Sequence, residues 1–180
     1  MKKILTLVTA TLGLSISLLS LTAAGHGPTP QKVERIVMIK ADPAKVWALV
    51  KDFGNIQAWH PGVASTKLEK KGDETFRTLT FKNGGHVYEK LTSIDDASMK
   101  IKYEIEEGTL PLTDYYATMT VEKGDKAGES KVTWVGRFYR LYKLNPPIPE
   151  GQDDATAVKA IEGIFDSGLA NLQKVAESSK

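Results

Sequence analysis

The sequence contains no cysteine, and only three of its 180 residues are histidine. Without cysteine the chain can form no disulfide, has no thiol nucleophile and lacks the residue that carries a lipoprotein anchor. The histidines, His26, His60 and His86, include no pair at the spacing that places two ligands on one helix face. The sequence therefore predicts no metal site, and packing alone must hold the fold.

An excess of charge of one sign is also missing. The chain has 24 Lys and Arg against 22 Asp and Glu. Two of the basic residues, Lys2 and Lys3, precede an uncharged, largely apolar stretch at residues 4–25. A basic start, an apolar middle and a small-residue end are typical of a secretory signal peptide, and we expect cleavage after Ala24 or Gly25. Removing two of the 24 basic residues leaves 22 against 22, so net charge supports neither nucleic-acid binding nor a membrane-surface role.

The chain is expected to divide into three parts: a signal peptide at 1–24, a flexible mature N-terminus at 25–31, and one domain at 32–178. The mature chain of about 155 residues is long enough for one hydrophobic core. Export predicts a periplasmic protein with no stable membrane anchor after cleavage. The alternative is an uncleaved anchor, since the apolar run is nearly long enough to span a bilayer.

Motifs for catalysis and phosphate binding are missing as well. Residues 128–132 come nearest to a nucleophile elbow, but they lack its second glycine and fall in a polar hairpin. The pair Gly84-Gly85 is typical of a turn and not of a phosphate-binding loop. The sequence thus predicts no catalytic residue and no cofactor.

The sequence does contain a distinctive order of elements. A strand at 33–40 precedes a helix that is capped by Asp42, begins at Pro43 and ends before Gly54. A further helical turn is expected at 55–59. Alternating apolar and polar residues, separated by turn signals, then predict six strands, at 63–70, 75–82, 86–94, 99–106, 115–122 and 131–141.

After a proline-rich linker at 145–151, the chain ends in one long helix that is capped by Asp153 or Asp154 and runs to about Glu177. Its apolar residues recur at steps of three and four: Val158, Ile161, Phe165, Leu169, Leu172 and Val175. A strongly curved antiparallel sheet cannot bury its own concave face, and this helix is the partner that can fill it. We therefore predict an α+β helix-grip fold, in which a curved seven-stranded antiparallel sheet wraps around the C-terminal helix, with two short helices after the first strand.

A gap between that helix and the sheet would form a cavity. Its predicted lining, a candidate ligand-binding site, consists of Trp59, Arg77, Glu89, Met99, Tyr103, Tyr115, Met119, Trp134, Phe138, Ile161, Phe165 and Leu169. A carboxylate in such a cavity has a raised pKa and could act as an acid or base, which leaves open an enzyme that uses Glu89 or Asp114. In the alternative, these polar residues pair with neighbours or face water. A second group is predicted to contact a protein partner: Trp59, His60, Pro61, Pro147 and Ile148.

Several segments resemble one known superfamily. Residues 41–47, 52–54 and 59–61 are similar to the opening of SRPBCC (START/Bet v 1-like) domains. Further similar segments lie at 110–115, 132–134 and 168–172, so the resemblance covers residues 32–177. It implies the same helix-grip fold that the pattern of elements predicts, but such motifs specify a fold better than a function.

Together with the leader, the lack of cysteine and the linker, the domain looks most like the periplasmic accessory proteins of bacterial methanol oxidation, the MxaD type. That resemblance implies a non-enzymatic protein that helps methanol dehydrogenase to interact with its cytochrome c acceptor. It carries over no catalytic residue. Two alternatives remain: a periplasmic carrier of a small hydrophobic ligand held between Phe165, Leu169 and the sheet, and a polyketide cyclase-like or hydrolase-like enzyme.

Overall fold

The computed structural model describes residues 27–178, so the predicted signal peptide at 1–24 lies outside the described part of the chain. The elements follow one another in the predicted order. The first strand starts at Gln31, inside the stretch expected to be a flexible N-terminus. Within residues 27–178, no helix combines the length and the apolar character needed to cross a bilayer.

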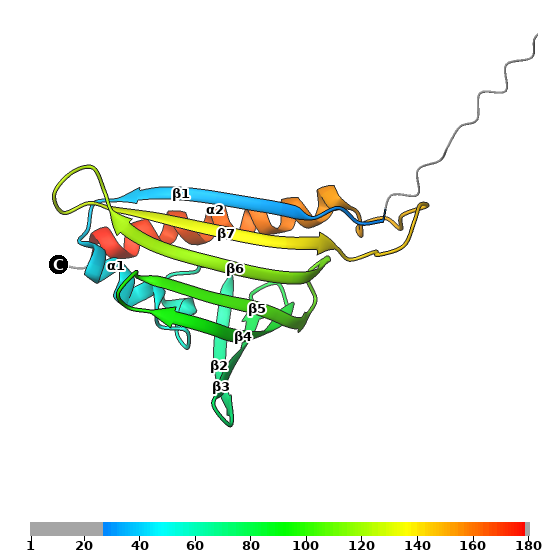
Figure 1. Cartoon of the computed structure of the whole chain (residues 1–180), viewed down its shortest axis with the longest axis horizontal. Coiled ribbons are helices and arrows are strands. Elements are labelled where there is room, and N and C mark those ends of the chain that lie inside the picture. Colours follow the sequence, from blue (N-terminus) through cyan, green and yellow to red (C-terminus); the bar gives the residue numbers. More distant parts are fainter. Residues whose placement is uncertain (1–26, 179–180) are drawn as a thin grey trace, which may run out of the picture.

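Seven strands form one antiparallel sheet in the order β1-β7-β6-β5-β4-β3-β2. Their bounds are β1 Gln31–Ile39, β2 Val63–Lys71, β3 Glu74–Phe81, β4 His86–Asp95, β5 Lys100–Gly108, β6 Leu112–Lys123 and β7 Ser130–Arg140. Five of these strands run side by side along the long axis of the molecule, while β2 and β3 turn away from that direction (Figure 1). The sheet is therefore strongly curved, and the predicted helix-grip class is confirmed.

Two short helices follow β1, as predicted: α1 (Pro43–Val50) and the 3-10 helix η1 (Ile56–Ala58). Asp42 caps α1, since its carboxylate accepts a hydrogen bond of 2.8 Å from the Ala44 backbone N–H. The helix ends three residues before Phe53, whose side chain is nevertheless buried in the core.

The long helix α2 (Asp154–Ser178) is capped by Asp153, which accepts a hydrogen bond of 2.7 Å from the Thr156 backbone N–H. It lies along β1 and β7 (Figure 1). Its Phe165 ring stacks on the Trp134 ring of β7, with centroids 4.1 Å apart and planes 14° from parallel. The helix thus fills the concave face of the sheet.

One glycine of α2 allows this close approach. A Cβ atom on Gly168 would lie 2.7 Å from Cδ2 of His60 and 3.0 Å from the Trp134 ring. The contact with His60 is closer than real Cβ atoms show and the one with Trp134 is unusually tight, so a larger residue here would force the ring or the helix to move.

The structure corrects two strand boundaries. Met99, which the alternation places in a strand, lies in the preceding turn with a φ of 46°, and β5 begins at Lys100. In contrast, β6 begins at Leu112, inside the stretch interpreted as a loop. Within β6, Asp114 has a φ of 52° and interrupts the pairing with β7 between Thr113 and Tyr116. This bulge shapes the site described below.

Candidate functional site

A small cavity of about 30 Å³ lies between α2 and the sheet. Six of the twelve predicted pocket residues line it: Arg77, Glu89, Tyr103, Tyr115, Trp134 and Ile161. Four others, Trp59, Met119, Phe165 and Leu169, are buried in the packed core, Met99 is half-buried in its turn, and Phe138 lines a different, outer pocket. A cavity of this size holds roughly one water molecule, whereas sites for small ligands measure about 300–1,000 Å³.

The polar groups beside the cavity are paired with each other. Arg77 on β3 and Glu89 on β4 are cross-strand partners, each 4% exposed, and the Arg77 Nε–H donates to the Glu89 Oε2 at 2.5 Å. The Arg77 Nη1–H donates to the Phe53 carbonyl oxygen at 3.0 Å, and the guanidinium carbon lies 4.0 Å from the centroid of the Phe53 ring. Burial raises the pKa of Glu89, while the charge of Arg77 opposes that rise. The carboxylate is held by the guanidinium at the wall of the cavity.

Two tyrosines close the inner end of the cavity. The Trp134 indole N–H donates to the hydroxyl oxygen of Tyr103 at 2.9 Å, and Tyr115 lies beside Tyr103 with ring centroids 6.4 Å apart. Burial raises the pKa of both tyrosine hydroxyls, so both stay protonated. The interior is a packed core with a small, mainly apolar cavity, and the buried indole N–H of Trp59 has no hydrogen-bond partner among the described residues.

His60 lies in this core and not on a surface. Its Nδ1 accepts a hydrogen bond of 3.1 Å from the Gly62 backbone N–H, so the proton belongs on Nε2, which lies 3.0 Å from the Ile164 carbonyl oxygen. Burial lowers the pKa of this ring. His60 is 3% exposed and Trp59 2%, so the prediction that these two side chains contact a partner is wrong. Both pack around α2, where the Asn171 side chain also donates to the Trp59 carbonyl oxygen at 2.8 Å.

The other three predicted partner contacts lie nearer to solvent. Pro61 and Pro147 are exposed, and Ile148 is half-buried. Pro61 follows η1, whereas Pro147 and Ile148 belong to the linker before α2.

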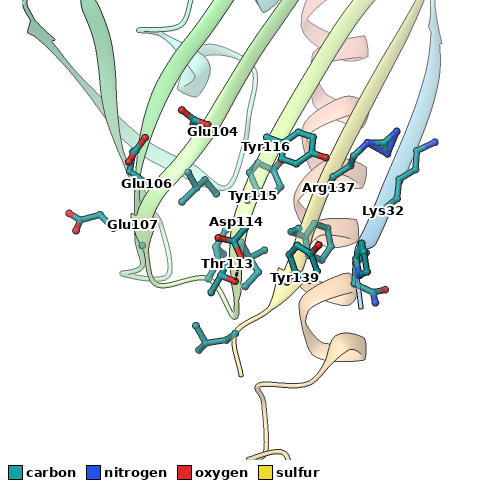
Figure 2. Close-up of a pocket in the computed structure, with 18 residues that line it drawn as sticks. Lys32, Glu104, Glu106, Glu107, Thr113, Asp114, Tyr115, Tyr116, Arg137 and Tyr139 are labelled. Atoms are coloured by element: carbon teal, nitrogen blue, oxygen red, sulfur yellow. Dashed lines mark hydrogen bonds between the residues drawn. The ribbon is translucent and has the colours of Figure 1, made fainter. Parts of the chain in front are cut away.

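A much larger pocket, of about 810 Å³, opens where β5 and β6 separate. The ladder between these strands runs from Lys100↔Thr120 to Glu104↔Tyr116 and stops there. Beyond this point the two strands diverge (Figure 2). We call this pocket the β5–β6 groove; it is lined by Pro30, Gln31, Lys32, residues 104–108, Leu110, residues 112–116, residues 137–139 and Leu141.

The two rims of the groove carry opposite charges (Figure 2). On one side, β5 carries three glutamates: Glu104, Glu106 and Glu107. Arg137 of β7 and Lys32 of β1 lie on the other side, since these two residues are cross-strand partners. Aromatic side chains lie between the rims: Tyr115, Tyr116 and Tyr139.

Some of these charges already have partners. Lys32 pairs with Glu34, and the carboxylate of Asp114 lies 2.8 Å from Nζ of Lys143. That lysine lowers the pKa of Asp114. Asp114 is thus an ionised residue on the groove's rim and not a buried acid, which corrects its predicted place in the cavity. Within residues 27–178, the exposed Arg137 makes no hydrogen bond or ion pair, although its charge helps to lower the pKa of Glu34, and it lines the groove.

The floor of the groove is also a wall of the interior cavity. Ile105, Leu110 and Tyr115 line both spaces. Three side chains therefore separate the small cavity from solvent at this end of the sheet. Sequence reasoning missed the groove because residues 107–114 fall between two predicted strands and do not reveal that both strands continue past the end of their ladder.

The described residues contain no cluster of three or more His, Asp or Glu side chains that could hold a metal ion. The titratable groups of the interior are paired and buried, and those of the groove are exposed to solvent. The groove, with its open volume and charged rims, is an arrangement suited to binding.

Comparison with known proteins adds a family match over most of the chain. The model of the family described as polyketide cyclase / dehydrase and lipid transport matches residues 30–177. No curated protein sequence matches the chain.

Several solved structures are similar to this one. Protein XoxI from Bacillus cereus is 26% identical, with a TM-score of 0.69, and the match covers 82% of this chain and 96% of that one. An uncharacterised protein from Bacillus thuringiensis is 26% identical, with a TM-score of 0.68 and coverage of 80% and 97%. A START superfamily protein from Mycobacterium smegmatis, at 12% identity, a TM-score of 0.64 and coverage of 83% and 99%, shares the fold alone.

Proposed function

Since the chain belongs to the polyketide cyclase / dehydrase and lipid transport family, we propose that it is a binding protein whose binding surface is the β5–β6 groove. The predicted SRPBCC membership is confirmed at the level of family and fold. The finer part of the proposal is that the protein is a non-enzymatic, periplasmic accessory protein of methanol oxidation. In that role it assists the interaction of methanol dehydrogenase with its cytochrome c acceptor.

The observation that carries a binding role on the surface is the contrast between the two spaces. The interior cavity measures about 30 Å³ and its charged groups satisfy each other, whereas the open groove measures about 810 Å³. Glu89 is locked to Arg77, and Asp114 is exposed and paired with Lys143. The geometry therefore supports neither carboxylate as the acid or base of an enzyme, and it favours contact with a partner along the groove.

The methanol-oxidation setting is supported by the combination of this domain with a predicted signal peptide, the lack of cysteine and the linker at 145–151, which together look most like the MxaD type. A groove with one acidic and one basic rim suits a protein partner, because charges of both signs orient a protein surface better than a neutral pocket does.

The test is to combine purified mature protein with methanol dehydrogenase and its cytochrome c and to follow cytochrome reduction. We expect direct binding to one of the two proteins and faster reduction. Arg137→Ala should weaken both effects. Lys67→Ala, an exposed change on β2 outside the groove, should leave them unchanged. Absence of binding together with an unchanged reduction rate would overturn the proposal.

A second candidate, a carrier of a small hydrophobic ligand, is favoured by one observation. Ile105, Leu110 and Tyr115 line both the groove and the cavity, so a movement of these side chains would join the two spaces. Native mass spectrometry of protein isolated from the periplasm should then show a bound apolar molecule. Protein of the bare polypeptide mass in every preparation would count against a carrier.

A further inference from the structure

We propose that the β5–β6 groove binds an extended peptide segment of a protein partner, which enters the sheet as an additional strand between β5 and β6. This inference rests on the proposed function, in that the groove is the binding surface. It adds the conformation of the bound segment and the chemistry of its side chains.

The backbone on the β5 side of the groove is prepared for such pairing. On its far edge, the end of β5 pairs with β4 through Val87↔Gly108 and Tyr88↔Glu107, beyond a bulge that shifts the register between Tyr88 and Glu89. On the edge that faces β6, the recorded ladder ends at Glu104, so residues 105–108 have no partner strand in the described chain. Unpaired N–H and C=O groups along a strand edge are a template for another strand.

The β6 side is less open, because the Leu112 backbone N–H already donates to the Leu110 carbonyl oxygen at 2.8 Å. Leu112 and Thr113 are in register with Arg140 and Tyr139 of β7, which occupies their other edge. The bulge at Asp114 and Tyr115 separates this pair from the ladder that β6 forms with β5 further along. Residues 109–111 join the two strand ends, so a peptide can enter only from the open face of the groove, where the unpaired edge of β5 is available to it.

The size of the groove agrees with a short strand. Residues 105–108 correspond to about 13 Å of extended backbone at about 3.3 Å a residue. A volume of about 810 Å³ has room for the backbone and side chains of such a segment, and not only for a single side chain.

The groove also specifies the side chains of the segment, because successive residues of a strand point to opposite faces. One face of the inserted strand would lie over Ile105, Leu110 and Tyr115, which favours apolar residues there. The other face would lie between the two charged rims. We expect an acidic residue toward Arg137 and a basic residue toward Glu106.

The acidic rim also decides against a nucleic acid as the occupant. Three glutamates on β5 would repel a phosphate backbone, whereas the same rim attracts lysine or arginine on a peptide. The occupant to which the geometry points is therefore an extended peptide that alternates apolar with charged residues and carries both signs of charge.

The probe is a short synthetic peptide, acetylated and amidated, that alternates valine with polar residues and carries lysine toward one end and aspartate toward the other. Its control has the same sequence with N-methylated amides at alternate positions, which removes backbone donors and keeps every side chain. Amide hydrogen exchange and chemical shifts of the protein, followed by NMR, report where each peptide binds. We expect the unmodified peptide to slow exchange at least tenfold for the β6-facing amides within residues 105–108, and the methylated peptide to lose at least tenfold in affinity.

A charge exchange tests the orientation. Arg137→Glu should weaken binding of the probe at least fivefold, and a peptide with lysine in place of its aspartate should restore the affinity to that variant. Lys67→Glu, which makes the same charge change outside the groove, should leave the affinity unchanged. Failure of the probe to bind, equal binding of the methylated peptide, or unchanged exchange at residues 105–108 would each overturn the strand proposal.

The two proposals fail in distinguishable ways. If methanol dehydrogenase or its cytochrome c binds while exchange at residues 105–108 stays unchanged, strand insertion is wrong and the accessory role stands. If the probe is bound and these amides are protected while neither protein has an effect, the strand site stands and the methanol-oxidation role is wrong.

Discussion

His60 is buried in the core, where no acidic side chain of the described residues lies close enough to stabilise a protonated ring. Its ring lies between Trp59 and Trp134, with centroids 5.8 Å and 6.2 Å away, and its two nitrogens are used by backbone groups of Gly62 and Ile164. The nearest charge effect on it is repulsion from the buried Arg77. These surroundings keep the imidazole neutral in the folded protein.

Lowering the pH should therefore destabilise the protein through His60. Burial lowers the pKa of His60 in the folded state below the unfolded value of about 6.5. As the pH drops below that value, the unfolded chain binds a proton at His60 that the folded chain does not. The free energy of unfolding therefore decreases until the pH reaches the pKa of His60 in the folded state. Urea unfolding at about pH 7.5 and about pH 5.5 should show this loss. His60→Gln, which keeps a donor for the Ile164 carbonyl oxygen, should lose less stability between the two pH values. An equal loss in both proteins would show that His60 does not cause it.

The buried pair of Arg77 and Glu89 gives a second prediction at this scale. Glu89→Gln leaves the Arg77 charge buried without its counter-ion, and we expect a loss of about 3–5 kcal/mol in the free energy of unfolding. Replacing both residues, by Arg77→Met with Glu89→Leu, should cost clearly less, because no isolated charge is then left in the core. The control Glu106→Gln, on the exposed rim, should change stability by no more than about 0.5 kcal/mol. Chemical denaturation of the four proteins checks the order.

At the scale of the element, α2 and the strands differ in how far the sequence determines them. The stripe that contains Ile161, Phe165 and Leu169 predicted both the helix and its buried face, because a period near 3.6 leaves only one apolar side. The alternation of β5 predicted a half-buried strand equally well. It carries no information about where pairing with β6 stops, which depends on the left-handed conformation of Asp114, a residue with no glycine-like signal. The groove could therefore not be predicted from the sequence pattern.

Two glycines of α2 provide a matched pair of substitutions. At Gly168 a Cβ atom would lie 2.7 Å from the His60 ring, whereas at Gly163 nothing lies within 4 Å of that position. Gly168→Ala should lower the free energy of unfolding by about 1–3 kcal/mol, since α2 must move away from the sheet. Gly163→Ala should raise it by about 0.5–1 kcal/mol through the better helix propensity of alanine. Thermal and chemical unfolding should show opposite signs, and the same sign for both would contradict the packing of α2 described above.

For the whole molecule, the order of elements predicted a cavity between a curved sheet and the helix that it wraps, and the structure shows how far side chains fill that cavity. Buried side chains, among them the stacked rings of Trp134 and Phe165, fill the space between helix and sheet and leave about 30 Å³. Pattern alone identifies which side chains point inward, and six of the predicted residues do line the cavity. It cannot give the remaining volume, because that volume is a small difference between the separation of the layers and the size of the side chains.

Removing one ring should reopen the interior. Phe165→Ala should cost about 3–5 kcal/mol of unfolding free energy and leave an apolar cavity. Such cavities bind small apolar molecules, so benzene should raise the unfolding temperature of the variant. The parent protein should show no comparable shift. An equal benzene effect in both proteins would indicate that the natural interior already accepts such ligands.

The pairing of β1 with β7 also sets the order in which the polypeptide can mature. Gln31 faces Phe138, so the first strand of the domain finds its partner only after the other five strands have been made. A nascent chain that leaves the ribosome N-terminus first must therefore keep β1 unmatched until its last third emerges. A chain that crosses a membrane through a narrow channel must be unfolded, and late pairing of β1 with β7 helps to keep a domain of this topology unfolded until it has passed through.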